Sequence, residues 1–252
     1  MKLVLASASP RRQELLADLG LSFAVRPADI DESVHAGEAG AEYVRRLARE
    51  KAAAVAGASE LVIAADTTVD LDGELLGKPI DEDDARALMR KLSDSVHYVH
   101  TGVCALLIEA DGTRREESTV VTTAVTFAPV PDAWIDWYIA TGEPFDKAGG
   151  YGMQGSAAIF VHRIDGSPTN VIGLPLGQGP SSIAANGLSL NIRGRPNRDP
   201  CTSVGPRCEP IHKLPVGHSP DVFRHPQDKR IQGLQSDCVD ACEAFDSGSE
   251  TD

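Results

Sequence analysis

The chain has 252 residues, 42% of them hydrophobic, and its formal net charge is -13 at pH 7. This composition supports a hydrophobic core in one large domain or two small ones. The acidic balance argues against broad nucleic-acid binding, which requires a basic face. No stretch approaches the roughly 18 apolar residues of a membrane span, and the N-terminal apolar run is too short for a signal peptide. We therefore expect a cytoplasmic protein with no nucleic-acid or membrane partner.

The composition changes near Leu176. Residues 177–252 hold 8 of the 16 prolines and 8 of the 23 glycines, and they show almost no periodicity apart from a helical pattern at Cys238–Phe245. This predicts an ordered domain over 1–176 and a mostly disordered, irregular tail over 177–252. Four of the five cysteines fall in this tail, and their spacings match no zinc pattern.

The ordered region begins with a strand–turn–helix pattern. Lys2–Ala6 is a short apolar strand, and Ser9 is placed to cap a helix that starts at Pro10 and ends at Gly20. Ser22–Arg26 has the pattern of a second strand. The first turn of this region therefore joins the end of a strand to the N-terminus of a helix.

Helix and strand patterns alternate through the middle of the region. Apolar residues recur at helical spacing over 38–57, and Leu61–Ala65 predicts a buried strand that ends at Asp66. Asp72-Gly73 marks a hairpin turn. A helix is expected over 81–92, with Asp81 as its cap.

A long hairpin and a final strand complete the pattern. Val99–Glu109 and Thr113–Phe127 flank Asp111-Gly112, which predicts a second hairpin. Pro131 begins a helix, and Ala157–Ile164 is read as the last strand. The sum of these elements is an α/β fold with a mixed, curved sheet.

The turn from Ser7 to Arg12 is the first candidate for chemistry. Free backbone N–H groups and the positive end of a helix dipole suit a phosphate at such a position. Ser7, Ser9, Arg11 and Arg12 add two hydroxyls and two guanidiniums, and guanidiniums bind phosphate oxygens in a bidentate way. The alternative interpretation is a helix cap followed by surface arginines.

Three charged residues are further candidates. Asp66, at the expected strand end, is placed to hold a divalent metal or orient a water, although an aspartate also commonly starts a turn. Lys78, between Gly77 and Pro79, is placed to meet developing phosphate charge, or is simply an exposed loop lysine. Lys51 neighbours the apolar stripe of its helix, where a lysine can also extend its ammonium to the surface.

The glycine-rich segment 146–155 is the last candidate. Four glycines in seven residues allow a close approach of the backbone to a ligand. The amide of Gln154 both donates and accepts, so it is suited to read the edge of a base. The alternative is a flexible turn before the last strand.

Seven segments follow one another along the chain: SASPRRQELL, LAREKA, AADTTV, GELLGKP, LS….H.V.TGV, DKAGGYGMQG and NVIGLPL. Together they resemble the Maf family of nucleoside triphosphate pyrophosphatases over about residues 1–176. The resemblance implies an elongated, curved mixed sheet flanked by helices, with two lobes around a central cleft. It also implies cleavage of a nucleoside triphosphate between the α and β phosphates with Mg²⁺ or Mn²⁺, and a homodimer.

The resemblance also implies roles for particular positions. The catalytic positions are Asp66, which would accept a proton, Lys51 and Lys78. The substrate-binding positions are Ser7, Arg11, Arg12, Thr67 and Gln154. The metal-binding positions are Glu32 and Asp66. Arg11, Thr67 and Gln154 would set the choice of substrate.

The motifs also favour one branch of the family. The Ala-Asp-Thr triplet at 65–67 and the Gly-Tyr-Gly-x-Gln-Gly loop at 150–155 resemble the branch that hydrolyses dTTP, UTP and some modified pyrimidine nucleotides. Two alternatives stay open: a 7-methyl-GTP pyrophosphatase, and a regulator of cell division that binds nucleotide without turnover. The chain departs from the family after GLPL, because Gly177-Gln178-Gly179-Pro180 cannot continue as the closing amphipathic helix of its relatives.

Overall fold

The computed structural model describes residues 2–177. The irregular tail and the short helix predicted at Cys238–Phe245 lie outside the described residues. No helix within residues 2–177 combines the length and the apolar character that a membrane crossing requires.

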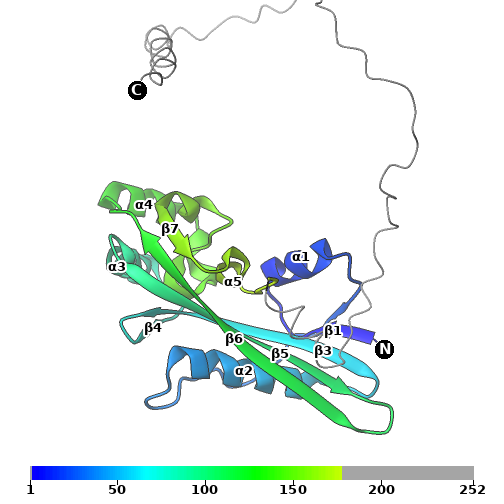
Figure 1. Ribbon diagram of the computed structural model, residues 1–252. Coiled ribbons are helices and arrows are strands. Elements are labelled where there is room, and N and C mark those ends of the chain that lie inside the picture. The colour runs from blue at the N-terminus through cyan, green and yellow to red at the C-terminus, as the bar shows by residue number, and fades with distance from the viewer. Residues whose placement is uncertain (1, 178–252) are drawn as a thin grey trace, which may run out of the picture. The chain divides into compact units, whose positions relative to one another are not determined.

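Seven strands form one mixed sheet with the order β2-β1-β3-β5-β6-β7, and β4 pairs with β3 (Figure 1). The pairs β1–β2 and β1–β3 are parallel, and the others are antiparallel. The strands are β1 (Lys2–Leu5), β2 (Ala24–Val25), β3 (Glu60–Leu71), β4 (Glu74–Leu76), β5 (Val96–Ile108), β6 (Arg114–Phe127) and β7 (Val161–Asp165). The predicted α/β fold with a mixed, elongated sheet is confirmed.

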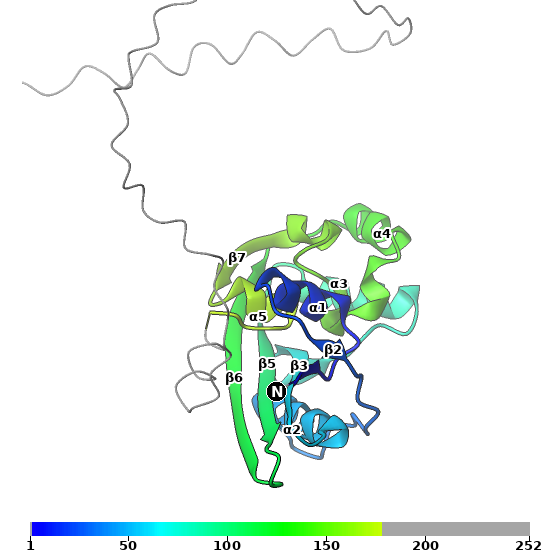
Figure 2. The same ribbon diagram turned by 90° about the vertical axis from the view of Figure 1, so that its right-hand side faces the viewer.

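Helices flank this sheet. They are α1 (Pro10–Asp18), α2 (Gly40–Val55), α3 (Glu82–Leu92), α4 (Asp132–Ala140) and α5 (Pro168–Ile172). Three 3-10 turns follow α4: η1 (Glu143–Asp146), η2 (Ala148–Gly150) and η3 (Ser156–Phe160). Helix α2 covers one face of the sheet, and α1 and α5 cover the other (Figures 1 and 2).

Side-chain alternation along the strands explains how the two faces differ. On β3, Val62 and Ala64 pack with Ala48 and Ala52 of α2. Ile63 and Ala65 point to the opposite face, where they join a cluster formed with α1 and the segment after α5. Because successive strand residues face opposite sides, the next two residues, Asp66 and Thr67, face α2 and α1 respectively.

A separate core lies around α3 and α4. It joins the far ends of β3, β5 and β6 to α3, α4 and the aromatic residues of the glycine-rich segment, with Phe127, Tyr138, Tyr151 and Phe160 among its members. The clusters against α2 and α1 form one core region, and the cluster around α3 and α4 forms the other. The two regions meet near Asp66–Thr68. The hydrophobic clusters therefore divide the described chain into two lobes along one continuous sheet.

The expected turns are present at both hairpins. Asp72 and Gly73 have φ values of 52° and 86°, which the hairpin turn between β3 and β4 requires. Asp81 caps α3 by accepting a hydrogen bond of 2.8 Å from the backbone N–H of Asp84. The second hairpin turns at 109–113, between β5 and β6.

Four local predictions are wrong. Ser9 occupies the position before α1, but its side chain makes no capping hydrogen bond. The second strand contains only Ala24–Val25, and the last begins at Val161 because Ala157 through Phe160 form a 3-10 turn. Finally, Asp66 does not end its strand: β3 continues to Leu71, because its antiparallel partner β5 pairs with it as far as Asp70.

Candidate active site

The candidate site lies at a gap in the sheet. Strand β1 pairs with β3 over Glu60–Ile63, and β4 pairs with it over Val69–Leu71. Among the described strands, none pairs with this edge of β3 over Ala64–Thr68. An unpaired edge presents backbone N–H and C=O groups to a ligand. In α/β folds, ligands commonly bind just beyond the ends of parallel strands. The end of β1 follows this rule, whereas β3 continues past the gap and contributes residues from its middle.

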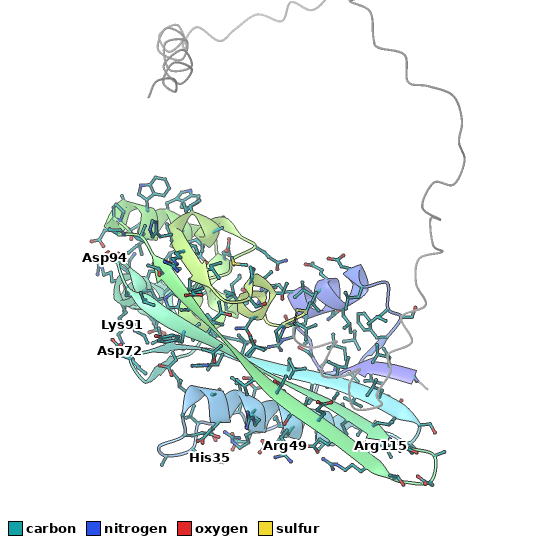
Figure 3. The ribbon with its side chains drawn as sticks, in the orientation of Figure 1. His35, Arg49, Asp72, Lys91, Asp94 and Arg115 are labelled. Atoms are coloured by element: carbon teal, nitrogen blue, oxygen red, sulfur yellow. The ribbon has the colours of Figure 1, made fainter. Side chains whose placement is uncertain are left out.

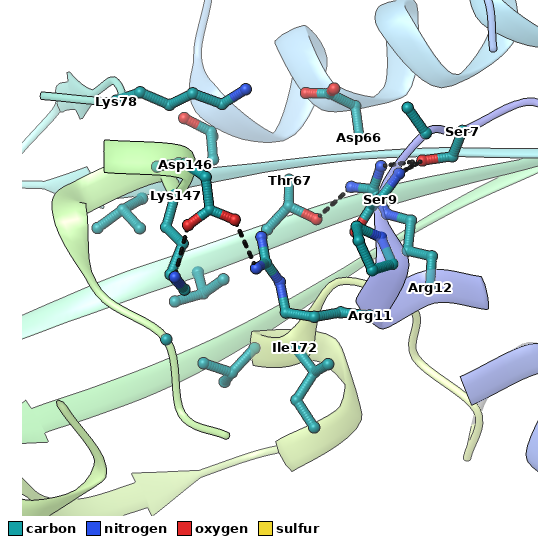
Figure 4. A pocket seen from close by; sticks show the side chains of 18 of the residues that line it. Ser7, Ser9, Arg11, Arg12, Asp66, Thr67, Lys78, Asp146, Lys147 and Ile172 are labelled. Carbon is teal, nitrogen blue, oxygen red and sulfur yellow. Dashed lines mark hydrogen bonds and ion pairs between the residues drawn. The ribbon is translucent and has the colours of Figure 1, made fainter. Parts of the chain in front are cut away.

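A pocket with a volume of about 630 Å³ opens at this gap. It is lined by all the residues that the sequence predicted for catalysis, substrate binding and metal binding, which come from separate parts of the chain. They are Ser7, Arg11, Arg12, Glu32, Lys51, Asp66, Thr67, Lys78 and Gln154. Figure 4 labels Ser7, Arg11, Arg12, Asp66, Thr67 and Lys78 among them. The N-terminal arginine turn and Asp66 therefore face a common cavity of a size usual for small-molecule sites.

Arg12 is the most constrained cation in the pocket. Its Nε donates to the carbonyl of Gly173 at 2.8 Å, Nη1 donates to Oγ of Ser7 at 3.0 Å, and Nη2 donates to Oγ1 of Thr67 at 2.9 Å. Burial lowers the pKa of its guanidinium, while the nearby carboxylate of Asp66 opposes this effect. A guanidinium has five N–H groups, so two remain for a ligand.

Lys51 joins two carboxylates on the opposite face. Its Nζ lies 2.6 Å from Oδ1 of Asp66 and 2.7 Å from Oε1 of Glu32. Lys51 and Asp66 are both 8% exposed, whereas the Glu32 side chain is 53% exposed. The predicted alternative, a lysine that extends to the surface, is wrong, because the ammonium is held inside by Asp66.

Burial and charge act in opposite directions on Asp66. Desolvation raises the pKa of its carboxyl, and Glu32 raises it further, whereas Lys51 and Arg12 lower it. The net direction is upward. A raised pKa makes this carboxylate a stronger base than an ordinary aspartate, which suits it to accept a proton.

Gly102 allows α2 to come close enough for the Lys51 contact. It pairs with Asp66 across β3 and β5, and a Cβ added to it would lie 2.2 Å from the carbonyl oxygen of Val44. Val44 and Lys51 are seven residues apart, on the same side of α2. Because residue 102 has no side chain, α2 packs close enough to the sheet for Lys51 to contact Asp66.

Arg11 is held by an acidic partner from the glycine-rich segment. Its Nη1 donates to Oδ2 of Asp146 at 2.9 Å, and Nζ of Lys147 lies 2.5 Å from Oδ1 of the same carboxylate. Lys147 also donates to the carbonyl of Glu143 at 2.6 Å. These contacts connect the start of the glycine-rich segment to Arg11 of α1.

Lys78 and Gln154 are the more open members of the site. Both are exposed and line the pocket. Lys78 has no ion-pair partner among residues 2–177, and Figure 4 shows its side chain on the same side of β3 as Asp66. A hydrogen bond of 2.9 Å from Gly149 N–H to the Gly77 carbonyl joins the two loops that carry Lys78 and Gln154. Both side chains are therefore available to a ligand.

The sequence did not single out several residues that line or support the pocket. Asp146 and Lys147 were quoted only as part of a glycine-rich segment. Tyr43 lines the pocket and donates from its hydroxyl to the Glu32 carbonyl at 2.9 Å. It lies on α2, the helix that carries Lys51, but it belongs to no motif that could have identified it.

The two carboxylates suit a divalent cation only together with a ligand. Among the described residues, no group of three His, Cys, Asp or Glu side chains is arranged to hold a metal ion. Mg²⁺ is commonly bound through one or two carboxylates plus phosphate oxygens of a substrate. Asp66 and Glu32 both contact the Lys51 ammonium through one oxygen, so their carboxylates lie close together, and their other oxygens fit a cation that arrives with a phosphate ligand.

The fold and the pocket define the class of protein. Two arginines, three lysines and three carboxylates around a sheet gap are suited to bind and transfer a phosphate group. A model of the family described as Maf-like protein matches residues 2–181. The chain belongs to the Maf family.

Two curated relatives illustrate the similarity. A dTTP/UTP pyrophosphatase of Anaeromyxobacter sp. (strain Fw109-5) is 56% identical over 177 residues, which are 70% of this chain and 85% of that protein. A dTTP/UTP pyrophosphatase of Myxococcus xanthus (strain DK1622) is 51% identical over 193 residues, which are 76% and 95% of the two chains. A solved nucleoside-triphosphatase / dITP/XTP pyrophosphatase from Mycobacterium abscessus is 16% identical and covers 52% of this chain and 76% of its own, at a TM-score of 0.32.

Proposed function

We propose that this protein hydrolyses dTTP and UTP to the nucleoside monophosphate and pyrophosphate. The observation that carries the proposal is the convergence of the arginine turn, the Lys51–Asp66 pair and Lys78 on one pocket. Relatives about half identical to this chain bear the name dTTP/UTP pyrophosphatase. Modified pyrimidine nucleotides are further candidate substrates.

Different residues of the pocket have different roles in the proposed reaction. Arg11, Arg12 and Lys78 bind the triphosphate and neutralise its charge. Asp66 accepts the proton of a water that attacks the α-phosphorus, and the bond from that phosphorus to the bridging oxygen breaks as pyrophosphate leaves. Because Oδ1 of Asp66 accepts from Lys51, Oδ2 is the oxygen assigned to this proton.

A divalent cation is part of the proposal. Asp66 and Glu32 would hold Mg²⁺ or Mn²⁺ together with phosphate oxygens, and the bound cation would supply charge neutralisation at the phosphates. Gln154 and Arg11 are assigned to recognition of the nucleotide, because Gln154 is exposed in the pocket and Arg11, in the first turn of α1, contacts Asp146 of the segment that carries Gln154.

The proposal also covers the location, the oligomeric state and the domain boundary of the enzyme. It acts as a cytoplasmic homodimer, without nucleic-acid or membrane partners, and residues 1–176 suffice for activity. The match to the Anaeromyxobacter relative takes in 70% of this chain and 85% of that protein, which supports that boundary. Light scattering tests the dimer, and turnover by a chain ending at Leu176 tests the boundary.

A substrate panel tests the activity. Pyrophosphate release from dTTP, UTP and 7-methyl-GTP is measured with Mg²⁺ on the full chain, and we expect the two pyrimidine nucleotides to be preferred. Asp66→Asn should abolish turnover while the circular dichroism spectrum stays unchanged. Asp72→Asn is the matched control: it is exposed at a hairpin tip (Figure 3), and asparagine tolerates its φ of 52°.

Each contrary result identifies an alternative. Preference for 7-methyl-GTP would replace the pyrimidine specificity. Thermal stabilisation by nucleotide without a metal-dependent product would favour the regulator that binds without turnover. Full activity of Asp66→Asn would remove Asp66 from the mechanism.

A further inference from the structure

The hydroxyl of Thr67 is committed to its neighbours inside the protein. It accepts a hydrogen bond of 2.9 Å from Nη2 of Arg12 and lies 2.9 Å from Oγ1 of Thr101. Oγ1 of Thr101 in turn donates to the backbone carbonyl of Asn170 at 2.9 Å. These contacts connect α1, β3, β5 and α5.

The chemistry of the groups fixes the direction of the chain. A threonine hydroxyl has one proton, and a carbonyl oxygen can only accept. Because Thr101 gives its proton to the Asn170 carbonyl, it must accept the proton of Thr67. Every proton is thereby assigned, from Arg12 to Thr67, then to Thr101, then to Asn170.

The end of the chain is anchored in the core. Asn170 is fully buried, and its Nδ2 donates to the carbonyl of Val99 at 2.9 Å and to Oγ1 of Thr123 at 3.0 Å. Thr101 is also fully buried. The hydroxyl that supports Arg12 is therefore held by residues that have no access to the pocket solvent.

We propose that Thr101, fixed by the Asn170 carbonyl, is a positioning residue that orients Arg12 through Thr67 for the triphosphate. This rests on the function proposed above. Thr67 has no proton left for a ligand, so its influence on substrate choice acts through the guanidinium. The two N–H groups of Arg12 that remain free then point in a fixed direction, which reduces the ordering required when phosphate binds.

The backbone carbonyl of Gly173 also helps to hold the guanidinium of Arg12 in place. Its carbonyl accepts from Nε of Arg12, and its φ of 120° is one that residues with side chains rarely adopt. A Cβ there would lie 3.3 Å from Oγ1 of Thr67 and 3.4 Å from Nε of Arg12. The segment after α5 therefore fits around the Arg12–Thr67 contact.

Thr101→Val tests the proposal, because valine keeps the shape and removes the hydroxyl. We expect the dissociation constant of dTTP, measured by calorimetry in EDTA, to rise about 10-fold, and kcat/KM with Mg²⁺ to fall by a similar factor. Thr101→Ser should restore both to within about 2-fold. Thr126→Val, on β6 and without a side-chain hydrogen bond in the described chain, should change neither.

A double-mutant cycle separates positioning from a general structural effect. In an Arg12→Ala background, Thr101→Val should weaken dTTP binding by less than about 2-fold, because the group that it positions is gone. An equal loss in both backgrounds, or no loss in the wild-type background, overturns the proposal. If Thr101→Val does not fold, Thr67→Val and Thr67→Ser break and restore the same chain.

The binding measurement keeps this inference distinct from the proposed function. Coupled loss of dTTP binding without any pyrophosphate release would refute the hydrolase and retain the positioning role. Pyrophosphate release with no coupling between Thr101 and Arg12 would retain the hydrolase and refute the positioning role.

Discussion

The ammonium nitrogen of Lys51 lies 2.6 Å from Oδ1 of Asp66, and both side chains are almost completely buried. One residue comes from α2 and the other from the middle of β3. The pair places a carboxylate inside the protein at the point where the parallel part of the sheet ends. Its ionisation depends on the lysine, because burial alone favours the neutral acid and raises its pKa.

Lys51→Met should therefore affect both stability and activity. Removing one partner of a buried ion pair leaves an unpaired charge, and we expect the free energy of unfolding to fall by about 3 kcal/mol. Turnover of dTTP should fall at least about 100-fold, because the acceptor carboxylate loses its cation. Urea denaturation and pyrophosphate release measure the two effects.

Two further variants check that explanation. Adding Asp66→Asn to Lys51→Met should recover part of the lost stability, since the unpaired charge is removed. Lys91→Met is the surface control: Lys91 pairs with Glu74 at 2.6 Å on the outside of α3 (Figure 3), and its loss should cost less than about 1 kcal/mol. Equal destabilisation by both methionine variants would contradict the role given to burial.

Gly102→Ala should separate α2 from the sheet. The added Cβ would lie 2.2 Å from the Val44 carbonyl oxygen, and backbone must move to relieve the overlap. We expect the free energy of unfolding to fall by about 3 kcal/mol and dTTP turnover to fall with it, because Lys51 moves with the helix. Gly77→Ala, where a Cβ meets nothing within 4 Å, is the matched control for stability.

The sequence predicted the elements better than it predicted their extent. Local signals are strong at Asp72-Gly73 and at Asp81, because a turn and a helix cap depend on neighbouring residues. The predicted end of β3 was wrong, because the strand continues past Asp66 by pairing with β5, which is remote in the chain. Long-range pairing leaves little trace in a short window of sequence.

The same difference between local signals and long-range contacts applies to the candidate site. Residues in compact motifs, such as Ser7 through Arg12, were identifiable by residue type and spacing. Thr101 and Asn170 each begin a recognised stretch, TGV and NVIGLPL, but no role could be predicted for either, because only the fold joins them to Arg12 through Thr67. Their importance is a property of contacts and not of composition.

Lys78 provides a test of binding that is independent of stability. It is exposed and has no ion pair within residues 2–177, so Lys78→Met should leave the free energy of unfolding within about 0.5 kcal/mol of the wild type. We expect kcat/KM for dTTP to fall about 100-fold, because a cation that meets developing phosphate charge is removed. An unchanged kcat/KM would exclude Lys78 from the reaction.

His97 should make stability depend on pH below neutrality. Its side chain is fully buried, Nε2 lies 2.7 Å from the hydroxyl of Tyr151, and the ring meets Phe127 edge-on at 5.1 Å. Burial lowers the pKa of His97 from 6.5 to about 4. Between these values the unfolded chain binds a proton at this residue and the folded chain does not.

The sign of the effect follows from that difference. As pH falls from 6.5 to about 4, the free energy of unfolding should decrease by an amount on the order of 3 kcal/mol from this residue, and the decrease should stop below about pH 4. The double variant His97→Phe, Tyr151→Phe replaces both hydrogen-bonding partners with apolar rings, which limits its cost in stability. Urea denaturation at pH 7 and pH 5 should show a smaller decrease in the double variant than in the wild type. The same decrease in both chains would place the pH dependence in other groups, such as half-buried His100 or the carboxylates.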